Sequence, residues 1–317
     1  MRARRALREL LDGMAPDAVG REGSCILKDG RRVGWAEYGS GGPVILYCHG
    51  FPGSRAEARL FAPALAAHRV RVLALDRPGF GRSDPCPGRT IRSWVSDARQ
   101  VLASLGIARC LALGVSGGAP YAFAMLHDAP EAAGGAIVCG LGPAEALFKE
   151  RRYFFPAAQV ALGLVERHPA FTPMLARLSV KFLRLRLEVA PIRYAGGCDR
   201  EVLADPRVDG LLTVAQIEGL RQGSRPGADE LGLYLSPWGF ALERIVKPVT
   251  LWHGAADRIV PIRVAYHVVE RLPFVCTHYR QADGHYSLPI RHAEKIVDAL
   301  LQIDGSVSSA SPRGVSR

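Results

Sequence analysis

Short apolar runs alternate with segments of helical periodicity over much of the chain. The apolar runs are 43–48 (PVILYC), 70–75 (VRVLAL), 110–113 (CLAL), 135–139 (GAIVC), 249–252 (VTLW) and 274–279 (FVCTHY). Continuous apolar runs of this length are typical of strands that are buried on both faces of a parallel sheet. The segments with helical periodicity are 55–67, 91–105, 119–127, 262–271 and 288–301. We therefore predict an α/β fold in which helices cover both faces of a mostly parallel sheet.

A hairpin precedes this alternation and a helical segment interrupts it. Asp29-Gly30 separates two strand-like stretches, at 24–28 and 32–38, and this dipeptide is a hairpin signal. From 141 to 245 the pattern is helical and carries several prolines. The resulting division is an N-terminal helix and loop (1–23), an α/β core (24–140 and 246–304), an all-helical insertion (141–245) and a disordered Ser- and Gly-containing tail (305–317).

Composition and charge narrow the classes of function. The chain has 317 residues, of which 48% are hydrophobic and 22% charged, as in soluble globular proteins. It has no apolar run of the ~18 residues that a membrane span needs, and no apolar leader region follows the basic N-terminus. We expect a cytoplasmic protein without a stable membrane anchor. Its seven cysteines form no C-x-x-C pair, so we expect reduced thiols and no metal. The net charge of +11 is spread along the chain without a nucleic-acid-binding signature, so we expect no nucleic-acid partner.

One short motif carries a specific chemistry. Gly114-Val115-Ser116-Gly117-Gly118 has the pattern G-x-S-x-G and lies between a predicted strand and a predicted helix. In this context the motif predicts a nucleophile elbow, a sharp turn that exposes the serine hydroxyl. Gly114 and Gly118 would remove side chains that such a turn has no room for. The motif is short, so its interpretation depends on partner residues elsewhere in the chain.

Candidate partners follow in the order that this fold requires. A serine hydroxyl needs a base to take its proton, and the base needs an acid to orient it. Asp257 follows the strand at 249–252 and His285 follows the strand at 274–279. The carboxyl ends of parallel strands share one edge of the sheet, where ligand sites lie. We predict Ser116 as nucleophile, Asp257 as orienting acid and His285 as general base, with Asp283 as the weaker alternative for the acid.

A fourth loop can stabilise the oxyanion of acyl transfer. The strand at 43–48 ends in His49-Gly50-Phe51-Pro52-Gly53-Ser54. Two N–H groups must point at the developing charge. We predict that Phe51 and Gly117 donate them, since Pro52 has no N–H. His49 and His253 are interpreted as structural residues of their loops, as are Asp76 and Arg82-Ser83-Asp84.

Taken together, these segments resemble the α/β-hydrolase superfamily, in its lidded branch. The similar segments are HGFPGS (49–54), DRPGFGRSD (76–84), GVSGG (114–118), HGAADRIVP (253–261) and DGHYSL (283–288). The resemblance implies an eight-stranded, mostly parallel sheet with a helical lid, here 141–245, after the sixth strand. The family's dehalogenases and epoxide hydrolases carry an aspartate at the elbow, whereas this chain has Ser116, which argues against those activities.

The leading hypothesis is a serine hydrolase that cleaves a small, mainly apolar ester, thioester, lactone or amide through an acyl-serine intermediate. A triad-containing ligand-binding or sensor protein, a C–C hydrolase and an acyltransferase remain alternatives. We expect a small-molecule acyl substrate and no cofactor; the oligomeric state is left open. Trp238, Phe240 and Tyr286 are candidates for the substrate pocket, with core packing as the alternative. The basic and apolar stretch 181–187 (KFLRLRL) is interpreted as a solvated lid face, with docking on an anionic lipid surface as the alternative.

Overall fold

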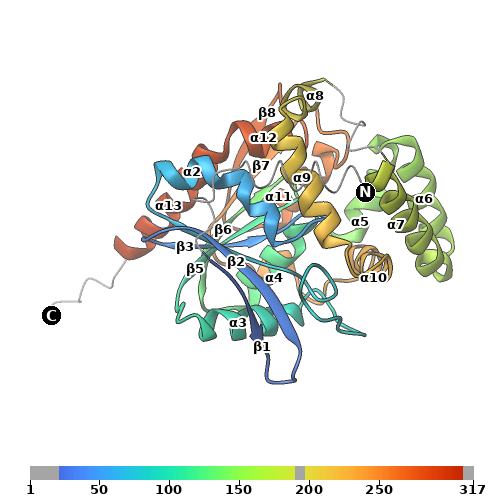
Figure 1. Ribbon diagram of the computed structural model, residues 1–317. Helices are drawn as coiled ribbons and strands as arrows, with labels where there is room; N and C mark the ends of the chain where they lie inside the picture. Colours follow the sequence, from blue (N-terminus) through green and yellow to red (C-terminus); the bar gives the residue numbers. More distant parts are fainter. Residues whose placement is uncertain (1–20, 190–196, 310–317) are drawn as a thin grey trace.

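The computed structural model describes residues 21–189 and 197–309 (Figure 1). Its centre is one eight-stranded sheet with the strand order β1-β2-β4-β3-β5-β6-β7-β8. The strands are β1 (Arg21–Ile26), β2 (Arg32–Gly39), β3 (Val44–Cys48), β4 (Arg71–Leu75), β5 (Cys110–Val115), β6 (Ala132–Val138), β7 (Val249–Gly254) and β8 (Val275–Arg280). Only β1–β2 and β2–β4 are antiparallel pairs in this sheet. The predicted mostly parallel sheet is confirmed.

Helices cover both faces of the sheet, and each face has its own core (Figure 1). On one face lie α3 (Trp94–Ser104), α4 (Ala119–Asp128) and α11 (Ile262–Arg271). The other face is covered by α2 (Ala62–Ala67), which follows the 3-10 turn η2 (Arg55–Phe61), and by α13 (Ala293–Ser309). Every residue of β3, β5 and β7 is buried, which explains why the central strands read as unbroken apolar runs.

The described residues between β6 and β7 form helices and short 3-10 turns, in agreement with the predicted helical lid after the sixth strand. The helices are α5 (Ala144–Lys149), α6 (Pro156–Arg167), α7 (Thr172–Val189), α8 (Cys198–Leu203), α9 (Pro206–Gly219) and α10 (Arg225–Tyr234). The 3-10 turns are η4 (Arg151–Tyr153), η5 (Pro169–Phe171) and η6 (Leu242–Arg244). Pro156 and Pro169 stand at the first positions of α6 and η5, where a missing N–H is not needed.

The ends of the core differ from the prediction. Residues 21–23 were expected in a loop, but they extend β1, where Arg21 pairs with Glu37 across the strands. Residues 305–309 were expected to be disordered, but α13 continues to Ser309. Asp304 anchors this helix by accepting a hydrogen bond from the Arg109 Nε at 3.0 Å, and Gly305 lowers helix stability by only about 1 kcal/mol. The remaining parts of the predicted terminal segments, 1–20 and 310–317, lie outside the described residues.

The predicted helix at 288–301 consists of two helices. α12 (Ser287–Arg291) ends at His292, and α13 begins at the next residue. The His292 ring lies 2.7 Å from the Asp283 carboxylate, so this residue is held by the loop before α12. The break keeps α12 next to the segment that carries His285, while α13 packs on the sheet.

Candidate active site

The turn after β5 has the geometry of a nucleophile elbow. Ser116 has φ +52°, which is uncommon for a residue with a side chain. It is the first residue of the 3-10 turn η3 (Ser116–Gly118), which leads directly into α4. A Cβ placed on Gly118 would lie 1.9 Å from the Cys48 carbonyl oxygen. A Cβ on Gly114 would lie 2.7 Å from the Ala122 Cβ. The glycines are therefore required by the close packing of β3, β5 and α4, and they leave the serine partly exposed at the sheet edge.

The three residues predicted as a triad meet at this edge. The Ser116 Oγ lies 2.9 Å from the His285 Nε2, and the Asp257 Oδ2 lies 2.8 Å from the His285 Nδ1. The other oxygen of Asp257 accepts the N–H groups of Ile259 and Val260, both at 2.8 Å. Since a carboxylate only accepts, the Nδ1 of His285 donates to Asp257 and the Nε2 is left to accept the serine proton. The arrangement is that of a nucleophile, a base and an orienting acid.

Burial and charge shift the pKa values of His285 and Asp257 in opposite directions. Burial alone would lower the pKa of His285, but the facing Asp257 carboxylate, its hydrogen bond and the nearby Asp199 raise the pKa above its ordinary value. Burial would likewise raise the pKa of Asp257, but His285 and the loop hydrogen bonds lower it below its ordinary value. Asp257 is therefore ionised at neutral pH and stabilises the imidazolium that forms when His285 takes a proton.

The two residues predicted to supply the oxyanion donors are neighbours. A Cβ placed on Gly117 would lie 2.8 Å from the Phe51 Cβ, so the loop after β3 meets the elbow at this point. Buried Glu57 fixes that loop: its Oε1 accepts the Gly50 N–H and the Tyr47 hydroxyl, both at 2.8 Å. Sequence reasoning missed Glu57, because its partners come from β3 and the loop and form no motif.

His49 and His253 have the structural roles expected of them. The Nδ1 of His49 donates to the Gly50 carbonyl at 2.9 Å, and burial holds the pKa of the ring well below its ordinary value. The Nε2 of His253 donates to the Val260 carbonyl at 2.8 Å in the loop that carries Asp257. Asp283, the alternative acid, instead binds Arg291 at 3.0 Å and His292 at 2.7 Å. Asp257 is thus the carboxylate that faces His285.

The structure adds an insertion residue to the site, Asp199 of α8. Its carboxylate accepts the backbone N–H groups of His285 (3.0 Å), Tyr286 (3.0 Å) and Ser287 (2.8 Å), as well as the Ser287 hydroxyl (3.0 Å). Asp199 is 5% exposed. A helix of the insertion therefore holds the backbone that carries His285. The sequence near Asp199 gives no signal for this contact, which joins segments 86 residues apart.

A second insertion contact reaches the elbow from α10. The Tyr234 hydroxyl lies 2.9 Å from the Gly117 carbonyl oxygen and 2.7 Å from the Glu230 Oε1. Glu230 is fully buried, its Oε1 lies 2.7 Å from the Arg77 Nε, and its Oε2 binds Arg89. Burial opposes ionisation of Glu230, but the two arginines lower its pKa to about 2. The spacing of Glu230 and Tyr234 by four residues, on one helix face, is the only sequence signal for this cluster.

The three aromatic residues predicted to line the substrate pocket lie in two different places: one is beside the triad and two are on α4. Tyr286 lies beside the triad, with its ring centre 5.4 Å from that of His285. Trp238 and Phe240 instead pack on α4: the Trp238 ring stacks on Phe123 at 6.2 Å, and the Phe240 ring lies 5.4 Å from His127. These two rings cover the far half of α4, which runs away from Ser116, and they belong to the hydrophobic core, in line with the alternative of core packing.

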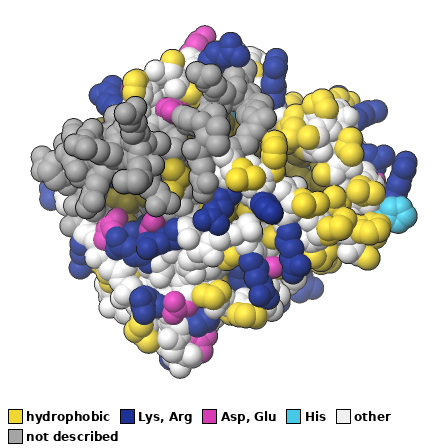
Figure 2. All heavy atoms as spheres, turned by 45° about the vertical axis from the view of Figure 1, so that its right-hand side comes forward, with side chains coloured by type: hydrophobic (Ala, Val, Ile, Leu, Met, Phe, Trp, Pro, Cys, Tyr) yellow, Lys and Arg dark blue, Asp and Glu magenta, His cyan; other side chains and the backbone are white. Residues whose placement is uncertain are grey.

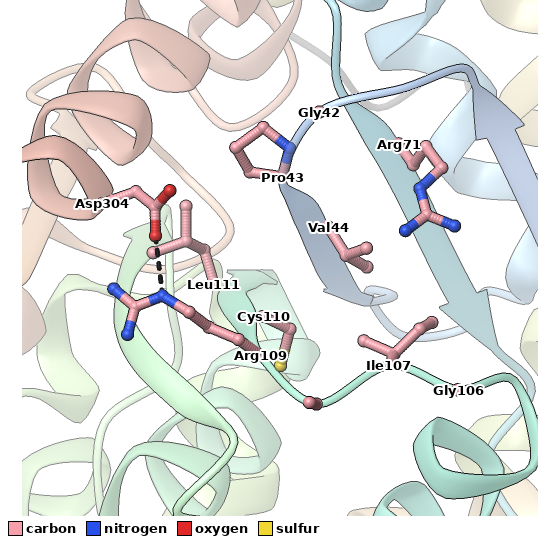
Figure 3. Close-up of a pocket in the computed structure, with 11 residues that line it drawn as sticks. Gly42, Pro43, Val44, Arg71, Gly106, Ile107, Arg109, Cys110, Leu111 and Asp304 are labelled. Atoms are coloured by element: carbon pink, nitrogen blue, oxygen red, sulfur yellow. Dashed lines mark hydrogen bonds and ion pairs between the residues drawn. The ribbon is translucent and has the colours of Figure 1, made fainter. Parts of the chain in front are cut away.

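Two other features of the described residues are a group of possible metal-ligand atoms at the triad and a pocket remote from it. Cys139, Asp257 and His285 offer ligand atoms within 4.8 Å of one another, but both His285 nitrogens already face Ser116 and Asp257, and burial raises the pKa of the Cys139 thiol well above its ordinary value. A pocket of about 180 Å³ opens at the amino ends of β3 and β5, lined by Arg71 and by the Arg109–Asp304 pair (Figure 3). It lies at the opposite edge of the sheet from Ser116.

Known proteins resemble the chain over most of its length. A family model described as alpha/beta hydrolase fold matches residues 43–288, more than half of the chain. The magnesium-chelatase 30 kDa subunit of Rhodobacter capsulatus is 29% identical over 264 residues, which cover 80% of this chain and 86% of that protein. The 2-hydroxy-6-oxononadienedioate/2-hydroxy-6-oxononatrienedioate hydrolase of Paraburkholderia phymatum is 26% identical, with coverages of 86% and 91%. An esterase structure from Exiguobacterium antarcticum superposes with a TM-score of 0.60 at 16% identity, over 90% of this chain and 100% of that chain, and supports the fold alone.

Proposed function

Because the chain belongs to the α/β-hydrolase family, we propose that it is a serine hydrolase that cleaves a small, mainly apolar ester through an acyl-serine intermediate. The observation that carries the proposal is the continuous line of hydrogen-bond distances from Ser116 through His285 to Asp257, at 2.9 and 2.8 Å. Thioesters, lactones and amides are cleaved by the same residues and belong to the same proposal.

The proposed reaction has two halves. In the first, the Ser116 Oγ attacks the carbonyl carbon while the His285 Nε2 takes the hydroxyl proton. The N–H groups of Phe51 and Gly117 stabilise the oxyanion. The tetrahedral intermediate collapses to an acyl-serine, and His285 returns the proton to the departing alkoxide.

In the second half, His285 takes a proton from a water molecule that attacks the acyl carbon. A second tetrahedral intermediate forms and breaks the bond to the Ser116 Oγ, which recovers its proton from His285. The products are an alcohol and a carboxylic acid, and the enzyme returns to its starting state. Asp257 keeps the correct imidazole nitrogen facing the serine in both halves.

The test compares wild type, Ser116→Ala and Ser96→Ala on a chain-length series of p-nitrophenyl esters. Ser96 is an exposed helix serine and serves as the matched control. We expect kcat/KM to fall by roughly 10⁴-fold or more in Ser116→Ala and to stay unchanged in Ser96→Ala. Near-normal turnover by Ser116→Ala would overturn the mechanism. A fluorophosphonate probe gives an independent readout, because it should label wild type at Ser116 and leave Ser116→Ala unlabelled.

The names of two relatives support two alternative functions, and the same experiments distinguish these from ester hydrolysis. One is named a hydrolase of 2-hydroxy-6-oxo dienedioates, which supports carbon–carbon bond cleavage as an alternative reaction. Another is named a subunit of magnesium chelatase, which supports a binding protein that keeps the triad. Serine-dependent turnover of a vinylogous 1,5-diketone without ester turnover would select the first. Probe labelling without turnover of either substrate class would select the second.

A further inference from the structure

Exposed apolar side chains are concentrated on the outer part of the insertion. Among the described residues, nine of the thirteen large hydrophobic side chains that are exposed lie between Tyr153 and Leu185. Seven of them form what we call the α6–α7 surface: Val160, Leu164, Phe171, Met174, Leu178, Phe182 and Leu185. Figure 2 shows hydrophobic side chains gathered on this part of the molecule, with lysine and arginine side chains among and around them. A contiguous apolar surface with a polar rim is typical of an interaction site.

Helix α7 shows how the two kinds of side chain are arranged. Met174, Leu178, Phe182 and Leu185 follow one another at intervals of four, four and three residues, so they share one helix face. Their exposed fractions are 50%, 57%, 61% and 53%. Exposed Arg177 and Lys181 each precede one of these residues directly, which places a basic stripe beside the apolar stripe. No Asp or Glu occurs between 172 and 187.

The face of α7 that packs inside the insertion is not the one that carries the exposed stripe. The opposite face of α7 is the one that packs, since Ala176 and Val180 are 5% and 0% exposed. A Cβ placed on Gly227 of α10 would lie 3.0 Å from a Val180 methyl group, so this face contacts α10. α6 is arranged in the same way, with Leu162 and Val165 buried and Val160 and Leu164 exposed. Both helices bury one apolar face in the protein and present a second one outward.

We propose that the α6–α7 surface docks the protein on an anionic lipid bilayer. Basic residues beside an exposed apolar helix face bind the headgroups while the apolar side chains enter the interface. None of the helices in the part of the chain that the structure describes is long and apolar enough to cross a membrane, so the contact is interfacial.

Charge argues against a second copy as the occupant. In a two-fold dimer through this surface, Arg177 and Lys181 of both copies would come close together, and the stretch 172–187 of α7 has no Asp or Glu to pair with them. Nucleic acid would explain the basic stripe but not the apolar one. An anionic bilayer complements both, and this inference is independent of the proposed hydrolysis.

The test is sedimentation of the full chain with phosphatidylcholine vesicles, with and without 30% phosphatidylglycerol, at low salt. We compare Arg177→Gln/Lys181→Gln and Met174→Gln/Leu178→Gln with a matched control, Val246→Gln/Phe274→Gln. The control removes two exposed apolar side chains, 71% and 58% exposed, outside the surface. All variants are also assayed on a soluble p-nitrophenyl ester, or by the fluorophosphonate probe, as a measure of folding.

We expect wild type and the control to sediment with the anionic vesicles and not with pure phosphatidylcholine. Each basic residue near an anionic surface should strengthen binding by a factor of about five. Removing both Arg177 and Lys181 should therefore weaken partitioning onto the anionic vesicles roughly 30-fold. Removing both apolar residues should weaken it at least ten-fold, since about 0.8 kcal/mol is lost per buried methylene. Absence of vesicle binding by wild type, or equal binding by all variants, would overturn the proposal. So would a concentration-dependent dimer that the two surface variants abolish, because it would assign the surface to a second copy.

Discussion

The inner and outer halves of the insertion have opposite polarity. The inner helices α8 and α10 bury acidic side chains against the core, with Asp199 5% and Glu230 0% exposed. The outer helices α6 and α7 expose apolar side chains such as Met174 and Leu178, and Figure 1 shows them at the edge of the molecule that is remote from most of the sheet. Buried charges require specific partners, whereas an exposed apolar face requires none for folding. The inner half is therefore bound to the loops that carry Gly117 and His285, and the outer half presents exposed apolar side chains.

This difference shows where the insertion contributes to the site. α8 reaches the His285 backbone, α10 reaches the Gly117 carbonyl, and a Cβ on Gly219 of α9 would lie 2.2 Å from the Gly53 carbonyl oxygen. Each of the three loops that carry Phe51, Gly117 and His285 thus meets one insertion helix. The insertion therefore helps to fix the backbone of these three loops.

The largest effect on stability is expected from Glu230→Gln, which removes the buried carboxylate that pairs with Arg77 and Arg89 in the inner half of the insertion. The substitution leaves Arg77 and Arg89 buried without a counter-charge, so the free energy of unfolding should fall by about 3–5 kcal/mol at pH 7. Urea unfolding measures it, with Glu201→Gln as control, since Glu201 is an exposed partner of Arg291. A loss below about 1 kcal/mol, the range of surface ion pairs, would contradict the assignment.

The same variant has a defined pH dependence. The folded-state pKa of Glu230 is lowered to about 2, against an ordinary value of about 4.3. Its stabilising contribution is therefore complete above the ordinary value and is lost as the pH falls toward 2. The difference in stability between wild type and Glu230→Gln should shrink over that interval.

An intermediate effect is expected from Asp199→Asn, which weakens the contact between α8 and the His285 loop. The amide presents N–H groups to backbone donors, so the loop shifts and kcat should fall about 10- to 100-fold, while KM changes little. The Asp199 charge also contributes to the raised pKa of His285. The base must be neutral, so kcat/KM declines as the pH falls below this pKa, and removing the charge should move that decline to lower pH.

Glu201→Gln, on the same helix, is the matched control for the Asp199→Asn pH profile. An altered fold alone would lower activity without moving the acid limb. An unchanged kcat together with an unchanged acid limb would show that Asp199 does not position His285.

The smallest effect is expected on the outer half. Met174→Gln/Leu178→Gln should change the free energy of unfolding by no more than about 0.5 kcal/mol, because both side chains are already exposed. Val180→Ala, on the buried face of α7, should lower it by at least about 1 kcal/mol. Urea unfolding of both variants sharpens the comparison, and a large loss from the double variant would show that the outer face has a folding role.

Local patterns in the sequence predicted the core and the triad. Unbroken apolar runs identify the central strands because both of their faces are buried, and Gly114 and Gly118 identify a turn that admits no side chain. Ser116, Asp257 and His285 each follow the carboxyl end of a parallel strand, so the topology alone brings them to one edge. Helix ends were less well predicted: the break at His292 depends on Asp283, and the extent of α13 depends on Arg109.

Only the tertiary structure decided the contribution of the insertion. Trp238 and Phe240 looked suitable for the pocket but pack on α4. Asp199 carried no recognisable pattern, and Glu230 had only its four-residue spacing from Tyr234. The physical reason is the range of the interactions. A buried strand shows in the sequence as an unbroken apolar run, and the elbow shows as glycines on both sides of Ser116, so the sequence displays both directly. The carboxylates of Asp199 and Glu230 also depend on donors that lie 86 and 109 residues away, His285 and Tyr121, and those donors are known only once the helices have docked.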